Sequence, residues 1–121
     1  MNYQKLTFED IMQTKILYFD KKVEVACLDI CSTLHIDTMP DYDSKHYYEL
    51  EINQFVKKNI SEELKLKTSD RIFDDLSIQK IKNNKYNVLF VYSGSILKGI
   101  VHFADYNKNI VLKRIQDDVL N

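Results

Sequence analysis

The sequence VLFVYSGSILKGIVHF, residues 88–103, contains the clearest structural signal of the chain. Val88 to Tyr92 is the longest apolar run, and a run of this kind is typical of a buried strand. Ser93-Gly94-Ser95 follows as a turn, and the residues from Ile96 to Phe103 predict a second strand. The stretch therefore predicts an antiparallel β-hairpin.

Length and composition limit the fold classes and the function classes. A chain of 121 residues with 45% hydrophobic and 29% charged residues matches one ordinary soluble domain with its own core. Two glycines and one proline exclude a collagen-like, linker-like or disordered protein. Seventeen basic and eighteen acidic residues leave a net charge of -1, so we expect no nucleic-acid partner.

The sequence shows neither the pattern of a signal peptide nor that of a membrane span. Glu9 and Asp10 interrupt the region where a signal peptide needs an unbroken apolar stretch. No window approaches the ~18 apolar residues of a membrane span. The two cysteines lie four residues apart and cannot staple a fold, which favours a reducing compartment. We therefore expect a cytoplasmic protein without a membrane partner.

The first half of the chain predicts a series of short elements. Thr7 followed by Asp10 resembles a capping box, so a short helix should begin near Phe8. Asp20 can cap a second helix, which runs to about His35. Its apolar face, with steps of three and four, is formed by Val23, Ala26, Cys27, Ile30, Cys31 and Leu34. The other predicted elements are a strand at Ile16 to Phe19, an extended piece from Pro40, a turn at Asp41 to Lys45, a strand at Tyr47 to Ile52 and a helix at Gln54 to Ile60.

The second half predicts a similar order of elements. The alternation from Leu64 to Lys67 predicts a strand. Ser69 or Asp70 should cap a helix. The inner side of this helix is expected to carry Ile72, Phe73, Leu76 and Ile81. After the hairpin, a final helix should run from about Asn107 to Leu120.

The two halves match at an offset of about fifty residues. Each is expected to follow the order strand, helix, strand, strand, helix. One such unit is too short to bury both faces of its sheet, so two of them should pack sheet to sheet. The predicted fold class is α+β, with two pseudo-symmetric β-α-β-β-α repeats. A single module covers residues 1–121, with repeat one at about 7–60 and repeat two at about 61–121.

Two stretches carry a resemblance to a known family. The stretch FEDIMQTKILYFDKKVEVACLDICSTLHIDTMPDYD, residues 8–43, resembles the first half of a cystathionine-beta-synthase-type (CBS) domain pair, or Bateman module. The stretch NVLFVYSGSILKGIVHFADYN, residues 87–107, resembles the end of its second repeat. Asp10-Ile11-Met12 looks like the family's entry motif, and Ala26 and Pro40 stand at its small-residue and proline positions. Gly99-x-x-His102-x-x-Asp105 is similar to its Gly-x-x-Thr/Ser-x-x-Asp ligand motif.

The resemblance implies a regulatory, ligand-sensing module. Such a module binds an adenosyl nucleotide (AMP, ADP, ATP or S-adenosylmethionine) in a cleft between the repeats. It usually forms a homodimer and serves a fused or separate effector domain. The residues that the resemblance assigns to the ligand are Gly99, Val101, His102, Phe103 and Asp105. In the family the aspartate accepts from the ribose hydroxyls, as a carboxylate facing a vicinal diol can.

The chain departs from the family motif in both halves. His102 replaces the Thr/Ser, and its ring could donate to a phosphate, more strongly once protonated below pH ~6.5, or could fill the cleft. In the first half the matching positions carry Tyr48, Glu51 and Gln54. A carboxylate there would repel phosphate, so we expect at most one intact nucleotide site per chain, the one with Asp105.

Each candidate residue of the ligand site also has a plain structural interpretation. Asp105 could serve as the N-cap of the last helix, alone or together with ligand binding. His102 could be a strand-end residue packed against Tyr106.

Two clusters of metal-capable residues are better explained without a metal. Cys27, Cys31 and His35 would spread over ~12 Å of helix, too far for bonds of ~2 to 2.3 Å to one ion, so we expect core packing. Asp41, Asp43 and His46 lack the glycine and distal glutamate of a calcium loop, which favours a solvated turn.

No catalytic constellation stands out, and the chain is not expected to be an enzyme or to need a cofactor. It contains no Gly-x-Ser-x-Gly elbow, no phosphate-cradling glycine loop with lysine and no His-Glu-x-x-His motif. The alternative to ligand sensing is a structural module that acts in dimerisation or protein–protein interaction. Its surfaces would be the region from Gln54 to Ile60 and the stripe of Ile110, Ile115 and Val119.

Overall fold

The computed structural model describes residues 5–85 and 87–120, and their side chains as far as residue 117. It divides this part of the chain into two compact units, which we call unit 1 (residues 5–15 and 62–120) and unit 2 (residues 16–61). Each unit combines helix with one three-stranded sheet, so the expected α+β class is confirmed. Among the described residues, no helix is both long and apolar enough to cross a lipid bilayer.

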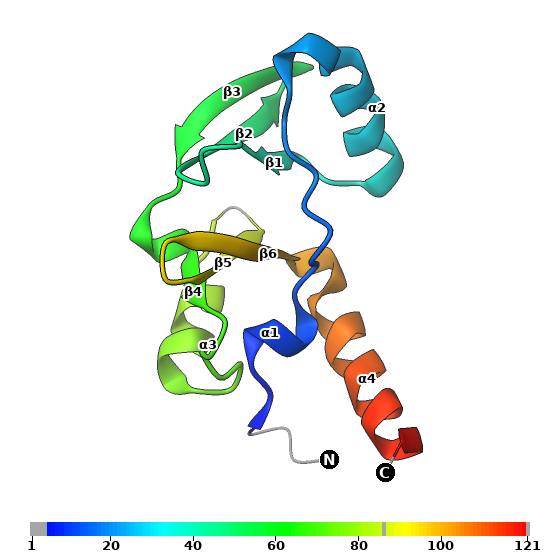
Figure 1. Ribbon diagram of the computed structural model, residues 1–121, viewed down its shortest axis with the longest axis vertical. Helices are drawn as coiled ribbons and strands as arrows, with labels where there is room; N and C mark the ends of the chain where they lie inside the picture. Colours follow the sequence, from blue (N-terminus) through cyan, green and yellow to red (C-terminus); the bar gives the residue numbers. More distant parts are fainter. Residues whose placement is uncertain (1–4, 86, 121) are drawn as a thin grey trace. The chain divides into compact units, whose positions relative to one another are not determined.

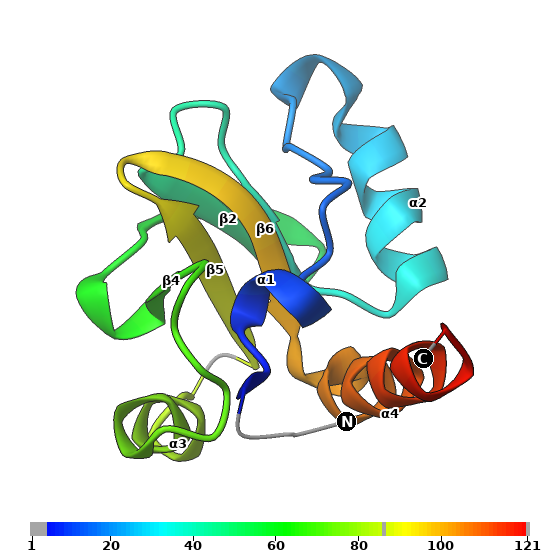
Figure 2. The same ribbon diagram turned by 60° about the horizontal axis from the view of Figure 1, so that its bottom comes forward.

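Unit 1 packs its helices against one face of its sheet (Figure 1). The sheet has the order β4-β5-β6, with β5 parallel to β4 and antiparallel to β6. The helix α1 lies between α3 and α4 beneath the sheet (Figure 2). The elements of unit 1 are α1 (Phe8–Ile11), a 3-10 turn (Glu62–Leu64), β4 (Lys65–Lys67), α3 (Asp75–Lys82), β5 (Val88–Ser93), β6 (Ile96–His102) and α4 (Phe103–Leu120).

The core of unit 1 forms around the central strand β5. Leu89 and Val91 from β5 and Val101 from β6 face this core, where Phe8 and Ile11 of α1 join them. Both faces of β5 are buried, because no residue from Val88 to Val91 is more than 1% exposed. The predicted buried strand and hairpin are therefore confirmed.

Helix boundaries in unit 1 differ from the sequence prediction at two places. The helix α3 begins at Asp75 rather than after Ser69 or Asp70. The backbone before it forms turns that are tied to the entry segment of the chain, because the Phe8 amide donates to the Asp70 carbonyl at 3.0 Å and the Ile72 amide donates to the Leu6 carbonyl at 2.9 Å. Leu76, predicted on the inner side, is consequently 79% exposed.

The helix α4 begins at Phe103 instead of Asn107, directly after β6. The predicted start of α1 at Phe8 is confirmed, and the Asp10 carboxylate accepts from the Thr7 amide at 2.9 Å. Unit 1 thus follows the predicted strand, helix, strand, strand, helix order in residues 65–120.

Unit 2 consists of one helix and an antiparallel meander, drawn with α2 beside the sheet β1-β2-β3 in Figure 1. Its core joins Phe19, Cys27, Cys31 and Met39, with Tyr48 and Phe55 packed against them. The elements of unit 2 are a 3-10 turn (Lys21–Val23), α2 (Glu24–Leu34), β1 (Thr38–Pro40), β2 (His46–Glu51) and β3 (Gln54–Asn59).

The helix α2 matches its predicted C-terminal end but neither its predicted start nor its predicted face. The Asp20 carboxylate accepts from the Lys22 amide at 2.9 Å and so caps the 3-10 turn Lys21–Val23, and α2 itself begins at Glu24. The helix ends at His35 in the left-handed region with φ 55°. Cys27 and Cys31 are buried, whereas Val23 and Leu34 are each 52% exposed. Two small thiols therefore contribute the fully buried part of this helix.

Two predicted elements of the first half are wrong. Ile16 to Phe19 forms no strand, although the Phe19 amide donates to the Pro40 carbonyl at 2.9 Å. The segment predicted as a helix at Gln54 to Ile60 instead contains the strand β3, Gln54–Asn59. Strand pairing is reinforced by Lys58, whose ammonium group donates to Glu49 at 2.6 Å and Glu51 at 2.8 Å. These two carboxylates raise the pKa of Lys58.

The physical reason for β3 lies in the turn that precedes it. Ile52 and Asn53 both have positive φ, 49° and 60°, as the central residues of type I′ hairpin turns do. Glu51 pairs with Gln54 across this turn. The segment after Asn53 therefore returns along β2, and unit 2 has one helix followed by three strands instead of the order expected for both repeats.

The hairpin turn yields a stability prediction. Ile52 is 99% exposed and branched at Cβ, so its left-handed conformation carries strain without compensating burial. Ile52→Asn should raise the free energy of unfolding by about 1 kcal/mol, because asparagine tolerates this conformation. Ile52→Val is the control and should leave the free energy of unfolding nearly unchanged, because valine is also branched at Cβ. Equal stability of Ile52→Asn and wild type in urea denaturation would contradict the turn geometry.

Candidate functional site

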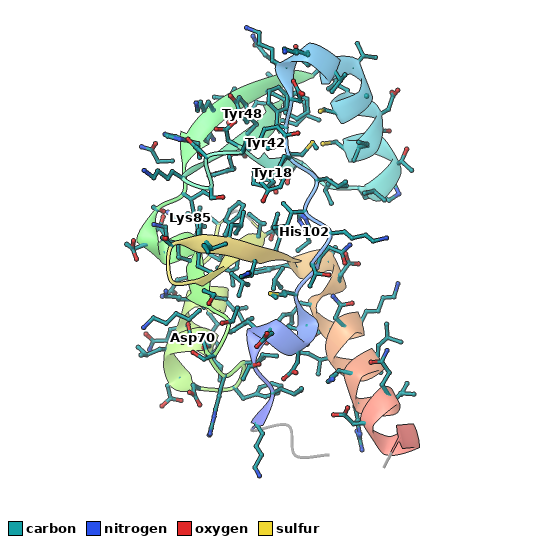
Figure 3. The ribbon with its side chains drawn as sticks, in the orientation of Figure 1. Tyr18, Tyr42, Tyr48, Asp70, Lys85 and His102 are labelled. Carbon is teal, nitrogen blue, oxygen red and sulfur yellow. The ribbon has the colours of Figure 1, made fainter. Side chains whose placement is uncertain are left out.

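The ligand residues implied by the family resemblance gather where β6 passes into α4. Gly99 and Val101 belong to β6, and His102 is its last residue. Phe103 is the first residue of α4, and Asp105 lies in the first turn of that helix. Figure 3 shows His102 at this strand end, next to the start of α4. We call the residues from Gly99 to Asp105 the β6–α4 junction.

The junction places two polar side chains at the start of a long helix. His102 directly precedes α4, and Asp105 is the third residue of this helix. Asp105 is exposed, and His102 is partly buried. Because α4 begins at Phe103, Asp105 is not the N-cap of this helix, so that interpretation of the residue is wrong.

The start of α4 also offers backbone donors. The first amides of a helix have no partner within it, and they attract acceptors and anions. One of them, the Phe103 amide, donates to the Asn87 carbonyl at 2.9 Å. The junction thus combines a carboxylate suited to a diol, an imidazole and a helix N-terminus suited to a phosphate.

Two of the five residues direct their side chains into the core. Val101 is 2% exposed and packs with the core of unit 1. Phe103 packs against the same core, and its ring lies 6.5 Å from that of Tyr106. Burial raises the pKa of Tyr106. The side chains of Val101 and Phe103 therefore belong to the core behind the junction.

Gly99 is explained by packing within unit 1. A Cβ atom at this position would lie 2.5 Å from Sδ, 2.6 Å from Cγ and 2.9 Å from Cβ of Met12. The backbone beside it is fixed, because Gln13 and Ile100 exchange amide-to-carbonyl hydrogen bonds of 2.8 and 3.1 Å. Met12 therefore occupies the space that the absence of a side chain leaves free.

Two cavities of unit 1 lie away from the junction. One, of about 360 Å³, runs beside α3 and the 3-10 turn before β4. Its lining residues are Glu63, Leu64, Leu76, Gln79, Lys80, Asn83, Asn84 and Lys85. The other, of about 200 Å³, lies between α1 and α4 and includes Met12 and Asn109. Neither of these two cavities includes a residue from Gly99 to Asp105.

The positions of unit 2 that match the motif form no equivalent junction. Tyr48 lies in β2, with its ring centroid 4.0 Å from that of Phe19 in the core. Glu51 and Gln54 flank the hairpin turn, and Glu51 is paired with Lys58. The following segment is β3, so this unit has no helix N-terminus at the corresponding place.

The structure places the two clusters of metal-capable residues in different surroundings. Cys27 and Cys31 are buried in the core of unit 2, as expected, and burial raises the pKa of Cys31 to about 11. In contrast, the ligand atoms of Asp41, Asp43 and His46 lie within 4.8 Å of one another. The Asp-x-Asp-x-x-His spacing was the available signal, but the sequence could not show that the turn brings the three side chains together.

Comparison with protein-family models and with curated proteins finds no match to this chain.

The contact between Met12 and Gly99 can be tested by mutation. Gly99→Ala should lower the free energy of unfolding by about 1–3 kcal/mol, because the new methyl group overpacks the site. In a Met12→Ala background the same change should cost at least about 0.5 kcal/mol less. A double-mutant cycle in urea measures this coupling. Additive effects, or a harmless Gly99→Ala, would show that packing does not require the glycine.

Proposed function

We propose that this chain is a regulatory module of the CBS type that binds an adenosyl nucleotide at the β6–α4 junction and catalyses no reaction. The observation that supports the proposal is the placement of Gly99-x-x-His102-x-x-Asp105. The motif spans the end of a strand and the first turn of an 18-residue helix, and its aspartate is exposed. The strand, helix, strand, strand, helix order of residues 65–120 agrees with the same proposal.

Each polar group of the junction has a distinct task in this proposal. Asp105 accepts hydrogen bonds from the two ribose hydroxyls. His102 and the first-turn amides of α4 donate to a phosphate oxygen, or to the carboxylate of S-adenosylmethionine. Asp105 itself would repel a phosphate placed beside it, so the sugar and the phosphate must bind on different sides of this turn.

Regulation follows from a difference in affinity between two states of the module. A ligand shifts a conformational equilibrium only as far as it prefers one state over the other. The β6–α4 junction would bind one nucleotide per chain. The conformational change that this favours would be passed to a fused or separate effector domain or to a second copy of the chain. The module itself needs no cofactor for this role.

The nucleotide proposal can be tested by thermal shift with AMP, ADP, ATP and S-adenosylmethionine. One of these ligands should raise Tm, because at 100 times Kd it stabilises the folded state by about 2.7 kcal/mol. Asp105→Asn should lower the affinity for this ligand by about tenfold or more, because an amide oxygen accepts hydrogen bonds from the two ribose hydroxyls less strongly than a carboxylate does.

The matched control is Asp75→Asn, an exposed aspartate in the first turn of the other long helix of unit 1. It should leave the ligand-induced shift unchanged. The absence of any shift at millimolar ligand would refute nucleotide binding. A shift that is equal in Asp105→Asn and wild type would refute the assigned site.

A second function is favoured by the outer face of α4. Val111 is 51%, Leu112 44% and Ile115 52% exposed, which places three large apolar residues on one helix surface. Ile110, predicted on this stripe, is instead 8% exposed and belongs to the core, and the side chain of Val119 lies outside the described residues. A structural module that dimerises or docks a protein through α4 would bury this face.

The interaction function predicts a mass that depends on concentration. Ile115→Glu should shift sedimentation toward the monomer, because a buried unpaired carboxylate opposes association. Leu76→Glu is the matched control, since Leu76 is an exposed leucine on α3 in the same unit and should leave association unchanged. A monomeric wild type at all concentrations, or equal masses for Ile115→Glu and wild type, would argue against self-association through α4.

A further inference from the structure

The turn between β1 and β2 gathers three ligand-type side chains on the surface of unit 2. Asp41 and Asp43 belong to the turn, and His46 is the first residue of β2. The turn is closed by the Asp41 amide, which donates to the His46 carbonyl at 2.9 Å. One carboxylate oxygen of each aspartate and one imidazole nitrogen lie within 4.8 Å of one another.

The carboxylate of Asp43 is already oriented for a ligand role. Its Oδ1 accepts from the amides of Lys45 at 2.8 Å and His46 at 3.0 Å. Its Oδ2 lies 2.5 Å from Nδ1 of His46. The backbone thus holds one oxygen, and the other faces the imidazole nitrogen. Supporting hydrogen bonds of this kind fix the direction of metal-binding carboxylates and tune their affinity.

Contacts outside the cluster hold the turn in place. Pro40 pairs with Tyr47 at the base of the turn. Tyr42, between the two aspartates, stacks on Tyr18 with ring centroids 4.8 Å apart and planes at 17° (Figure 3). Ser44 takes a positive φ of 60°, which bends the chain toward His46. Little backbone entropy therefore remains to be lost when the turn binds an ion.

We propose that Asp41, Asp43 and His46 bind one divalent transition-metal ion of the Zn²⁺, Co²⁺ or Ni²⁺ class. Donor atoms with bonds of about 2.0–2.2 Å to a shared ion lie at most about 4.4 Å apart. The ligand atoms of the three residues lie within 4.8 Å of one another, so a small rotation of the side chains would bring them into range. An imidazole with two carboxylates suits this class, whereas Ca²⁺ and Mg²⁺ prefer oxygen ligands alone. The ion takes the place of the proton between Asp43 and His46, and water completes its coordination.

The site is independent of the nucleotide proposal, because its residues all belong to unit 2 and the β6–α4 junction belongs to unit 1. Metal binding ties the start of β2 to the end of β1. It should therefore stabilise the folded state by mass action, and its effect should be visible without any assay of activity.

Titration with Zn²⁺ alone tests the proposal, read by calorimetry and by amide NMR spectra of the whole chain. We expect one ion per chain, with the largest shifts at residues 41–46. His46→Gln and Asp43→Asn should each raise Kd by about tenfold or more. Asp43→Asn keeps the side-chain oxygen that accepts from the Lys45 and His46 amides. NMR spectra of the metal-free variants check that each is folded.

His35→Asn is the matched control, because His35 is an exposed histidine of the same unit and asparagine tolerates its left-handed conformation. It should bind Zn²⁺ as the wild type does. A Co²⁺ spectrum without thiolate charge transfer should exclude Cys27 and Cys31 as ligands. No binding at millimolar Zn²⁺, a thiolate spectrum, or equal affinity of His46→Gln and wild type would overturn the proposal.

Discussion

The burial of β5 on both faces is the constraint on which the rest of unit 1 depends. A strand whose residues from Val88 to Val91 are at most 1% exposed must satisfy its backbone through β4 on one side and β6 on the other. The pairing with β6 fixes where the hairpin ends and therefore where α4 begins. The same pairing places Gly99 against Met12, so the entry segment of the chain and the junction share one packing contact.

The elements that the sequence predicted well are those with a local signal. The apolar run from Val88 to Tyr92 and the turn at Gly94 are encoded by neighbouring residues, and the hairpin was predicted correctly. The start of α3 could not be predicted in this way, because long-range hydrogen bonds to residues 6–8 hold the preceding backbone in turns rather than in a helix. The strand β3 was missed because its turn uses Ile52, a residue type that rarely adopts positive φ.

The candidate site was predictable in its position along the chain but not in the direction of its side chains. Periodicity places Gly99 and Val101 on one face of β6, yet only the packing of α1 shows that this face is the core. The early start of α4 moved Asp105 from a capping position into the first turn. Asp41, Asp43 and His46 were recognised as polar and assigned to solvent. Their convergence depends on Ser44 and on the stacking of Tyr42, which no composition rule reveals.

Each unit contains a β-hairpin, and the two hairpins differ in their turn and in the element that follows them. In unit 1 the hairpin β5–β6 turns through Gly94 and Ser95 and then continues into α4, which creates the junction. In unit 2 the hairpin β1–β2 has a longer turn, from Asp41 to Lys45, and β2 is followed by β3, so no strand-to-helix junction forms there. A helix N-terminus favours an anion, whereas a turn with two carboxylates favours a cation. The same hairpin can thus present opposite charge preferences in its two settings. Under the two proposals, the two units bind two chemically different ligands rather than two copies of one.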